Sequence, residues 1–187
     1  KSFNLTVQPG NAVTQHDFVL QPTKRPKVIM KDAAGNPIAS AVLLSYPNVA
    51  EIIGRQLALV LKANGVANVD WVISSAYSAI TFGHEVAKGL GARFMNVEKD
   101  PADPGQKRML WRRITFPEGS RVLQVEELIT TMGTTQEVKR AVLEGNEASI
   151  EFIPIIGTLV LRPPDLEVTR RTNKIIALVA QEIWAKK

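Results

Sequence analysis

The chain has 187 residues, of which 45% are hydrophobic and 22% are charged, a composition typical of one compact globular domain. Its 23 Lys and Arg residues outnumber its 18 Asp and Glu residues, and the formal charge of +5 favours an anionic partner without selecting one. The lack of cysteine excludes disulfides and thiolate metal sites, and no apolar run is long enough to cross a bilayer. We expect a single domain, residues 1–187, in a soluble, cytoplasmic protein with no membrane partner.

The first long element is predicted to be a helix. Apolar residues recur at helical spacing from about Pro47 to Lys62, after an N-terminal segment of residues 1–45. Residues 69–75 are an apolar, β-branched run, which is typical of a strand covered on both faces. Residues 79–91 then predict a second helix that glycine ends, and residues 92–97 predict a second strand.

Residues 98–120 interrupt this alternation. They hold three prolines and two glycines, which predicts a long loop or an irregular hairpin. Uncovered loops of this length inside a compact domain are usually functional or mobile. We therefore expect residues 98–120 to form a long mobile loop.

The remaining segments resume the alternation of strands and helices. Residues 121–125 predict a third strand, residues 134–145 a third helix, and residues 148–161 one or two more strands. A last helix is expected from about Asp165 toward Trp184. This order predicts an α/β fold with a parallel β-sheet core flanked by helices, whose site lies at the carboxyl ends of the strands.

Two adjacent acids and a hydroxyl-rich turn follow the third strand. A turn that opens a helix presents unpaired N–H groups and the positive end of the helix dipole, so it binds anions such as phosphate. Glu126 and Glu127 would repel a phosphate, but they can accept hydrogen bonds from sugar hydroxyls or hold Mg²⁺ through water. The segment therefore predicts a sugar-phosphate site. Its phosphate-binding candidates are Thr130, Thr131, Met132, Gly133, Thr134 and Thr135.

The stretch VLQVEELITTMGTT, residues 122–135, resembles the signature of the type I phosphoribosyltransferases. That signature is a buried strand, two acids, two apolar residues and a Thr/Gly turn that opens a helix. The segment SSAYSAI, Ser74 to Ile80, is similar to the pyrophosphate loop of the orotate phosphoribosyltransferases. The segment EKDP, residues 98–101, also resembles a segment of that branch. The resemblance covers most of residues 18–145. It implies the type I phosphoribosyltransferase fold, with a small N-terminal hood in residues 1–45.

The resemblance also implies an activity. Such an enzyme moves the 5-phosphoribosyl group of phosphoribosyl pyrophosphate to a nucleobase, orotate or another purine or pyrimidine, and releases pyrophosphate. Family members seat the 5-phosphate on the Thr/Gly turn, while the two acids, here Glu126 and Glu127, meet the ribose 2- and 3-hydroxyls. Mg²⁺ is the implied cofactor, held by these acids through water. The sequence does not identify the acceptor base.

Further roles follow from the same resemblance. Lys99 is expected to contact the leaving pyrophosphate when the long loop closes, as it commonly does across a dimer interface in the orotate branch, so a homodimer is implied. Arg162 corresponds to a base-binding arginine. The pyrophosphate loop is expected to comprise Ser75, Ala76, Tyr77 and Ser78.

The sequence departs from the family pattern at several positions. Met132 stands where the turn usually has glycine, so it is strained if its φ is positive, and Glu127 stands where Asp is commoner. Ser78 replaces a lysine, Met95 and Asn96 replace a basic pair, and the segment Gln21 to Thr23 replaces Lys-Ser-Gly. Four basic loop residues are candidates to restore the lost charge: Lys107, Arg108, Arg112 and Arg113.

Two other functions remain open at this point. The missing basic residues and Met132 favour a protein that senses a nucleotide or sugar phosphate on the same fold without catalysis. The segment KRMLWRR, residues 107–113, combines aromatic and basic residues as single-strand nucleic-acid binders do. Because the rest of the chain shows no basic stripe, we expect no nucleic-acid partner.

Overall fold

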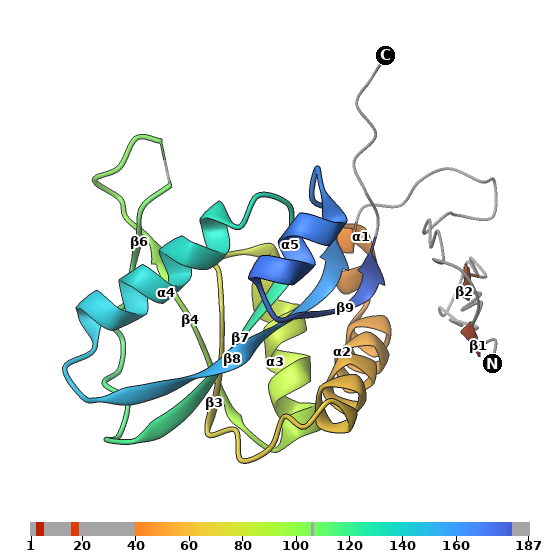
Figure 1. Cartoon of the computed structure of the whole chain (residues 1–187), viewed down its shortest axis with the longest axis horizontal. Coiled ribbons are helices and arrows are strands. Elements are labelled where there is room, and N and C mark those ends of the chain that lie inside the picture. Colours follow the sequence, from red (N-terminus) through yellow and green to blue (C-terminus); the bar gives the residue numbers. More distant parts are fainter. Residues whose placement is uncertain (1–2, 6–15, 19–39, 106, 181–187) are drawn as a thin grey trace.

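The computed structural model describes residues 3–5, 16–18, 40–105 and 107–180. Its centre is a five-stranded sheet in the order β4-β3-β7-β8-β9 (Figure 1), and every neighbouring pair in it is parallel. The α/β fold class expected from the sequence is therefore confirmed. The strands are β3 (Trp71–Ser74), β4 (Arg93–Asn96), β7 (Ser120–Ile129), β8 (Ile150–Leu161) and β9 (Ile175–Ala180).

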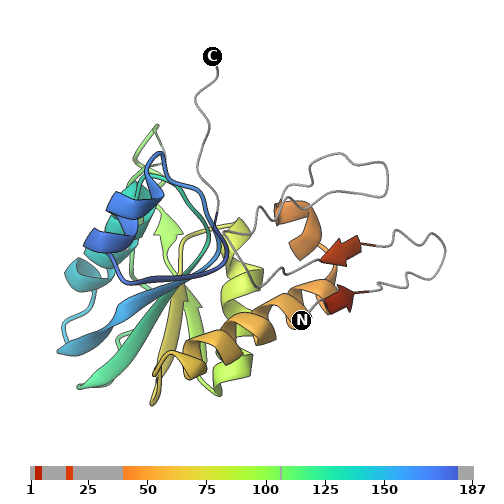
Figure 2. The same ribbon diagram turned by 45° about the vertical axis from the view of Figure 1, so that its right-hand side comes forward.

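Helices cover both faces of the sheet (Figure 2). Successive side chains of a strand point to opposite faces, so the two faces have separate apolar cores. Val72 and Leu123 pack in the core beneath α2 and α3, whereas Ile73 and Val122 pack in the core beneath α4. The helices are α2 (Pro47–Ala63), α3 (Ser78–Leu90), α4 (Gly133–Gly145) and α5 (Leu166–Thr172).

The helices begin and end where local chemistry favours it. A proline occupies the first turn of α2, where its missing N–H costs no hydrogen bond. α3 ends at Gly91 in the left-handed conformation, with φ of 75°, which glycine adopts without steric cost. The buried face of α2 follows the helical period expected from the sequence: Val49, Ile53, Leu57 and Leu61.

Part of the expected N-terminal hood is described. Two short strands, β1 (Phe3–Leu5) and β2 (His16–Phe18), pair in antiparallel fashion, and a one-turn helix, α1 (Ser40–Leu44), precedes α2. The departure from the family pattern at Gln21 to Thr23 lies outside the described residues. No helix among the described residues combines the length and the apolar character that crossing a membrane requires.

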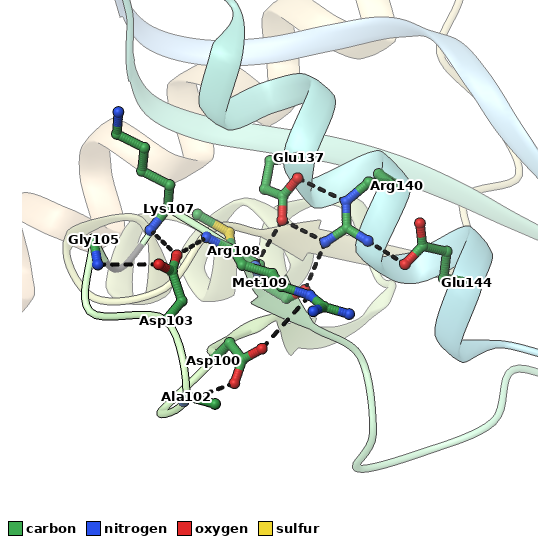
Figure 3. A network of polar contacts seen from close by, with 10 residues as sticks. All are labelled: Asp100, Ala102, Asp103, Gly105, Lys107, Arg108, Met109, Glu137, Arg140 and Glu144. Carbon is green, nitrogen blue, oxygen red and sulfur yellow. Dashed lines mark hydrogen bonds and ion pairs between the residues drawn. The ribbon is translucent and has the colours of Figure 1, made fainter.

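The long segment after β4 contains an irregular hairpin. β5 (Glu98–Lys99) pairs in antiparallel fashion with β6 (Met109–Leu110), and the returning strand is held against α4 (Figure 3). The backbone N–H of Met109 donates to Glu137 over 2.7 Å, and its carbonyl accepts from Arg140 over 3.1 Å. α4 therefore fixes the base of this hairpin.

The basic and aromatic residues that follow β6 have structural partners. Trp111 is buried, and its ring stacks on Phe116 with centroids 4.6 Å apart. Arg112 and Arg113 both pair with the carboxylate of Glu98. Because the indole ring is packed in the core, this segment offers no exposed aromatic surface on which a base could stack.

Over the described residues, the predicted C-terminal helix is wrong beyond its first two turns; its expected end toward Trp184 lies outside them. It begins as expected, since Asp165 caps α5 by accepting the N–H of Val168 over 2.9 Å. α5 ends at Thr172, however, and residues 175–180 form β9, which pairs with β8. This apolar segment is short and rich in isoleucine and valine, so the backbone hydrogen bonds that β8 offers decide its conformation.

Candidate active site

The sheet has a topological switch point between β3 and β7. These strands are parallel neighbours, but the chain leaves β3 for a helix on one face and leaves β7 for a helix on the other (Figures 1 and 2). Both helices begin after a residue with positive φ, 70° at Tyr77 and 64° at Met132. Two turns that feed helix N-termini therefore lie at one edge of the sheet, where α/β proteins bind ligands.

The turn between β7 and α4 has the geometry expected of a phosphate turn. Met132 is its left-handed residue and no side chain caps the helix, so the first N–H groups of α4 lack intrahelical partners. Thr131, Gly133 and Thr134 are exposed, whereas Thr135 is buried. A Cβ added to Gly133 would meet only the Thr131 hydroxyl, 3.9 Å away. The glycine thus leaves open space beside the first turn of the helix.

A cavity of about 930 Å³ opens on this turn. Thr131, Gly133 and Thr134 line it together with residues of the β5–β6 hairpin, Lys99 among them. Four basic and three acidic side chains contribute to the lining, so its charge is only modestly positive. The charged groups are Lys99, Lys107, Arg108, Arg140, Asp100, Asp103 and Glu137.

Several of these charges are paired within the hairpin network (Figure 3). Arg108 lies 3.5 Å from the carboxylate of Asp100, and Arg140 donates to Glu137 and to Glu144. The Arg140 guanidinium holds the pKa of the Glu137 carboxyl below its usual range. Of the four loop residues expected to restore positive charge, Lys107 and Arg108 line the cavity, while the other two pair with Glu98.

The acids lie within β7 rather than after it. Because they are consecutive strand residues, Glu126 and Glu127 point to opposite faces of the sheet. Glu126 is 2% exposed, and its carboxylate accepts the hydroxyl of Ser75 over 2.6 Å and the side-chain amide of Gln124 over 2.9 Å. Burial raises the pKa of the Glu126 carboxyl, because desolvation outweighs these hydrogen bonds. Glu127 accepts a hydrogen bond from Ser40 at the start of α1.

Gln124 is a site residue that the sequence analysis missed. The same amide nitrogen that donates to Glu126 also donates to the carbonyl of Thr135 over 3.1 Å. It thereby connects the first acid to the first turn of α4. A polar residue inside the apolar run RVLQV, two positions before an acid and so on the same face, was the available signal.

The other expected site residues lie near the same edge of the sheet. Ser75 is buried against Glu126, whereas Tyr77 is 67% exposed at the start of α3. The N–H of Arg162 donates to the carbonyl of Ile129 over 2.8 Å, which places this exposed arginine beside the beginning of the phosphate turn. Ala76 lies between Ser75 and Tyr77, and Ser78 is the first residue of α3.

The side chains of the site can be compared with those that the expected Mg²⁺ requires. Among the described residues no group of three or more His, Asp and Glu side chains could hold a metal ion. Mg²⁺ usually keeps several waters and is shared between one or two carboxylates and substrate phosphates rather than enclosed by protein. Glu126 and Glu127 supply carboxylates of the kind used in that shared mode, and because they point to opposite faces of the sheet they do not form a dedicated protein site.

Comparison with known proteins finds relatives of this chain. No family model matches the chain. An orotate phosphoribosyltransferase from Nitratiruptor sp. is 28% identical over 138 residues, 74% of this chain and 66% of the relative. Another, from Caldicellulosiruptor saccharolyticus, is 38% identical over 104 residues, 56% of this chain and 51% of the relative. The matched segments thus span about half to two thirds of these relatives.

A solved structure has the same fold. The crystal structure of orotate phosphoribosyltransferase from Aeropyrum pernix superposes with a TM-score of 0.54 at 17% identity. The match covers 84% of this chain and 86% of that one. This chain and that enzyme therefore share one fold, a parallel sheet flanked by helices.

Proposed function

We propose that this chain, which is similar to orotate phosphoribosyltransferases, is a type I phosphoribosyltransferase that transfers a 5-phosphoribosyl group from phosphoribosyl pyrophosphate to a nucleobase. Pyrophosphate is the second product. The observation that carries the proposal is the connection between the acids and the phosphate turn. Gln124 joins Glu126 to the first turn of α4 through hydrogen bonds of 2.9 and 3.1 Å, so groups suited to a pentose and to its phosphate adjoin each other.

The chain's own residues would act by positioning and by charge. The first N–H groups of α4, with the hydroxyls of Thr131 and Thr134, hold the 5-phosphate. The acids of β7 hold the pentose hydroxyls, and Lys99, which lines the same cavity as the turn, meets the leaving pyrophosphate. Displacement at the anomeric carbon by a ring nitrogen needs no protein nucleophile, so orientation and stabilisation of charge supply the rate enhancement.

Magnesium fits this scheme as a substrate-bound ion. Bound to pyrophosphate oxygens, it would neutralise charge on the leaving group. Glu126 and Glu127 would contact it through water. Ser75, Ala76, Tyr77 and Ser78 would present the turn before α3 to the same pyrophosphate, and Arg162 would face the base.

Pyrophosphate release tests the proposal. The chain is incubated with phosphoribosyl pyrophosphate, Mg²⁺ and one base at a time: orotate, uracil, adenine, guanine, hypoxanthine or xanthine. We expect one base to give equal amounts of nucleotide and pyrophosphate. Lys99→Met should lower kcat about tenfold or more, whereas Lys174→Met, which removes an exposed lysine of the C-terminal region, should not. Absence of product with every base would contradict the assignment.

A second candidate is a sensor that binds the sugar phosphate without turnover. It is favoured by the nearly balanced charge of the cavity lining and by Met132 in the left-handed conformation. Isothermal titration with phosphoribosyl pyrophosphate and Mg²⁺ separates the two. Binding followed by product on addition of a base supports the enzyme, and binding without product for any base supports the sensor.

The proposed enzyme is a homodimer, because in the orotate branch the lysine that corresponds to Lys99 commonly acts across a dimer interface. Sedimentation velocity at micromolar concentration should show a species of twice the chain mass. A monomer at all concentrations would refute the dimer without affecting the assigned chemistry.

A further inference from the structure

Hydrogen bonds connect the tip of the β5–β6 hairpin to its base. The carboxylate of Asp103 accepts three backbone N–H groups of the tip over 2.7–3.0 Å (Figure 3), those of Gly105, Lys107 and Arg108. Closer to the base, the N–H of Asp100 donates to the carbonyl of Arg108 over 3.1 Å, and Lys99 pairs with Met109. The place of Lys99 therefore depends on where Met109 is held.

Met109 is held by packing and by hydrogen bonds. Its side chain is 2% exposed and packs beneath α4 with Val138 and Ala141. Its N–H donates to a carboxylate oxygen of Glu137 over 2.7 Å, and its carbonyl accepts from Arg140 over 3.1 Å. These two helix side chains thus satisfy backbone groups that a further strand would otherwise pair.

This attachment lies close to the turn proposed to bind phosphate. α4 begins at Gly133, and an α-helix rises about 1.5 Å per residue, so Glu137 follows about 6 Å along the axis. One turn of helix and one pair of strand residues therefore connect Lys99 with the first N–H groups of α4. A ligand that reaches from these N–H groups to Lys99 meets a distance that the protein has set beforehand.

The local charge disfavours direct contact between Arg140 and an anionic ligand. Arg140 makes four hydrogen bonds, two to Glu137, one to Glu144 and one to Met109, out of the five N–H donors of a guanidinium. Its two carboxylate partners carry one negative charge more than the arginine offsets. Although Arg140 lines the cavity, this group of three side chains would repel a pyrophosphate.

We infer that Glu137 and Arg140 are positioning residues for the proposed transfer: through Met109 they hold Lys99 in a fixed place relative to the first turn of α4. The inference rests on the proposed function, because it assigns what sets the geometry of the same site. Neither residue touches the substrate. A displaced Lys99 would stabilise the departing pyrophosphate less, in a reaction that depends on orientation and charge.

Steady-state kinetics of pyrophosphate release tests this role. With the base that the panel identifies, Arg140→Met and Glu137→Leu should each lower kcat about tenfold. If the two side chains acted on the substrate through their charges, their effects on kcat/KM would have opposite signs, because loss of the arginine weakens attraction to an anion and loss of the glutamate strengthens it. Opposite signs would overturn the inference.

A double variant tests whether Arg140 acts through Lys99. Lys99→Met removes the cation that is positioned, so Arg140→Met should lower kcat no further in the Lys99→Met background. Additive losses would show that Arg140 acts on another part of the site, and would refute the inference.

Further variants separate positioning from damage to the fold. Glu137→Gln keeps an oxygen that can accept the Met109 N–H, so it should restore most of the kcat that Glu137→Leu loses. Glu144→Gln weakens an exposed contact of Arg140 and leaves the two hydrogen bonds of Met109 in place. As the control, it should keep kcat within about twofold of the unaltered protein.

Ribose 5-phosphate provides a readout that does not depend on Lys99, because it lacks the pyrophosphate. Its Kd, measured by titration calorimetry, should be the same in Arg140→Met, Glu137→Leu and the unaltered protein. A loss of this affinity in step with kcat would mean that the substitutions disturb α4 itself, and would contradict the positioning role.

The outcomes distinguish the inference from the proposed function. If no base gives pyrophosphate with the unaltered protein, the proposed function fails and the inference falls with it. If Lys99→Met lowers kcat and Arg140→Met does not, the function stands and only the positioning role is wrong.

Discussion

At the scale of single residues, the phosphate turn departs from its expected chemistry at one position. Met132 has φ of 64°, so the condition under which the sequence predicted strain is met. A non-glycine residue in this region costs about 1–2 kcal/mol. Gly133, in contrast, has no positive φ. The absence of a side chain there leaves space beside the helix N-terminus.

Met132→Gly should stabilise the protein. Relief of the left-handed strain is partly offset by the greater freedom of glycine in the unfolded chain, so we expect a net gain of about 0.5–1 kcal/mol in the free energy of unfolding. Urea denaturation measures it. Thr131→Gly, at a residue without positive φ, should destabilise instead. A loss of stability in Met132→Gly would mean that packing of the methionine side chain outweighs the strain.

Gly133→Ala should separate binding from folding. The added Cβ meets only the Thr131 hydroxyl at 3.9 Å, so the melting temperature should change little. The methyl group would occupy the space beside the helix N-terminus, and the affinity for ribose 5-phosphate should fall about tenfold, as loss of one charge-assisted hydrogen bond does. Titration calorimetry provides the measurement. Unaltered affinity would place the phosphate elsewhere.

Glu126 makes stability depend on pH with a definite sign. Because burial raises its pKa in the folded state, the folded protein holds the proton more tightly than the unfolded chain does. The stabilisation from this group is full below the unfolded pKa, about 4.3, and is lost as pH rises through the folded pKa. Glu126→Gln does not titrate, so its melting temperature relative to the unaltered protein should increase between about pH 4 and pH 7. A constant difference would contradict the raised pKa.

At the scale of elements, α4 has two tasks. Its N-terminus follows the turn that we propose to bind phosphate, and one turn later Glu137 and Arg140 hold both backbone groups of Met109. Gly145 at its other end lets the backbone of Trp111 approach the helix closely, since a Cβ at Gly145 would lie 2.1 Å from the Trp111 carbonyl oxygen. The base of the β5–β6 hairpin is thus attached to the same helix that opens the site, and the pairing of Lys99 with Met109 passes this restraint to Lys99.

Arg140→Met should release the hairpin while the sheet stays folded. Loss of the hydrogen bond to the Met109 carbonyl should speed hydrogen exchange at residues 98–110, with a global destabilisation of about 1 kcal/mol. Exchange followed by mass spectrometry detects this change. Arg55→Met on α2, where the arginine pairs with Glu51 at 3.6 Å in an exposed contact, is the control. Equal exchange in Arg140→Met and the unaltered protein would show that apolar packing alone holds the hairpin.

At the scale of the whole molecule, the parts that were predictable are those that local pattern determines. The period of α2, the apolar run of β3 and the order of elements indicate the fold, and the acids with their Thr/Gly turn indicate the site. β9 was not predictable in this way, because its short apolar run takes its conformation from the free edge of β8. The contacts of Gln124 depend on a helix that begins nine residues later, which no local spacing reveals.

The direction of the Gln124 amide has a consequence for what this chain tolerates. Its nitrogen lies between two acceptors, the Glu126 carboxylate and the Thr135 carbonyl. Glutamate has the same shape, yet at that position it would bring a second anion against the first with no donor between them, unless one of the two took up a proton. Position 124 therefore requires a hydrogen-bond donor, and because the side chain is buried it also requires one of about this length.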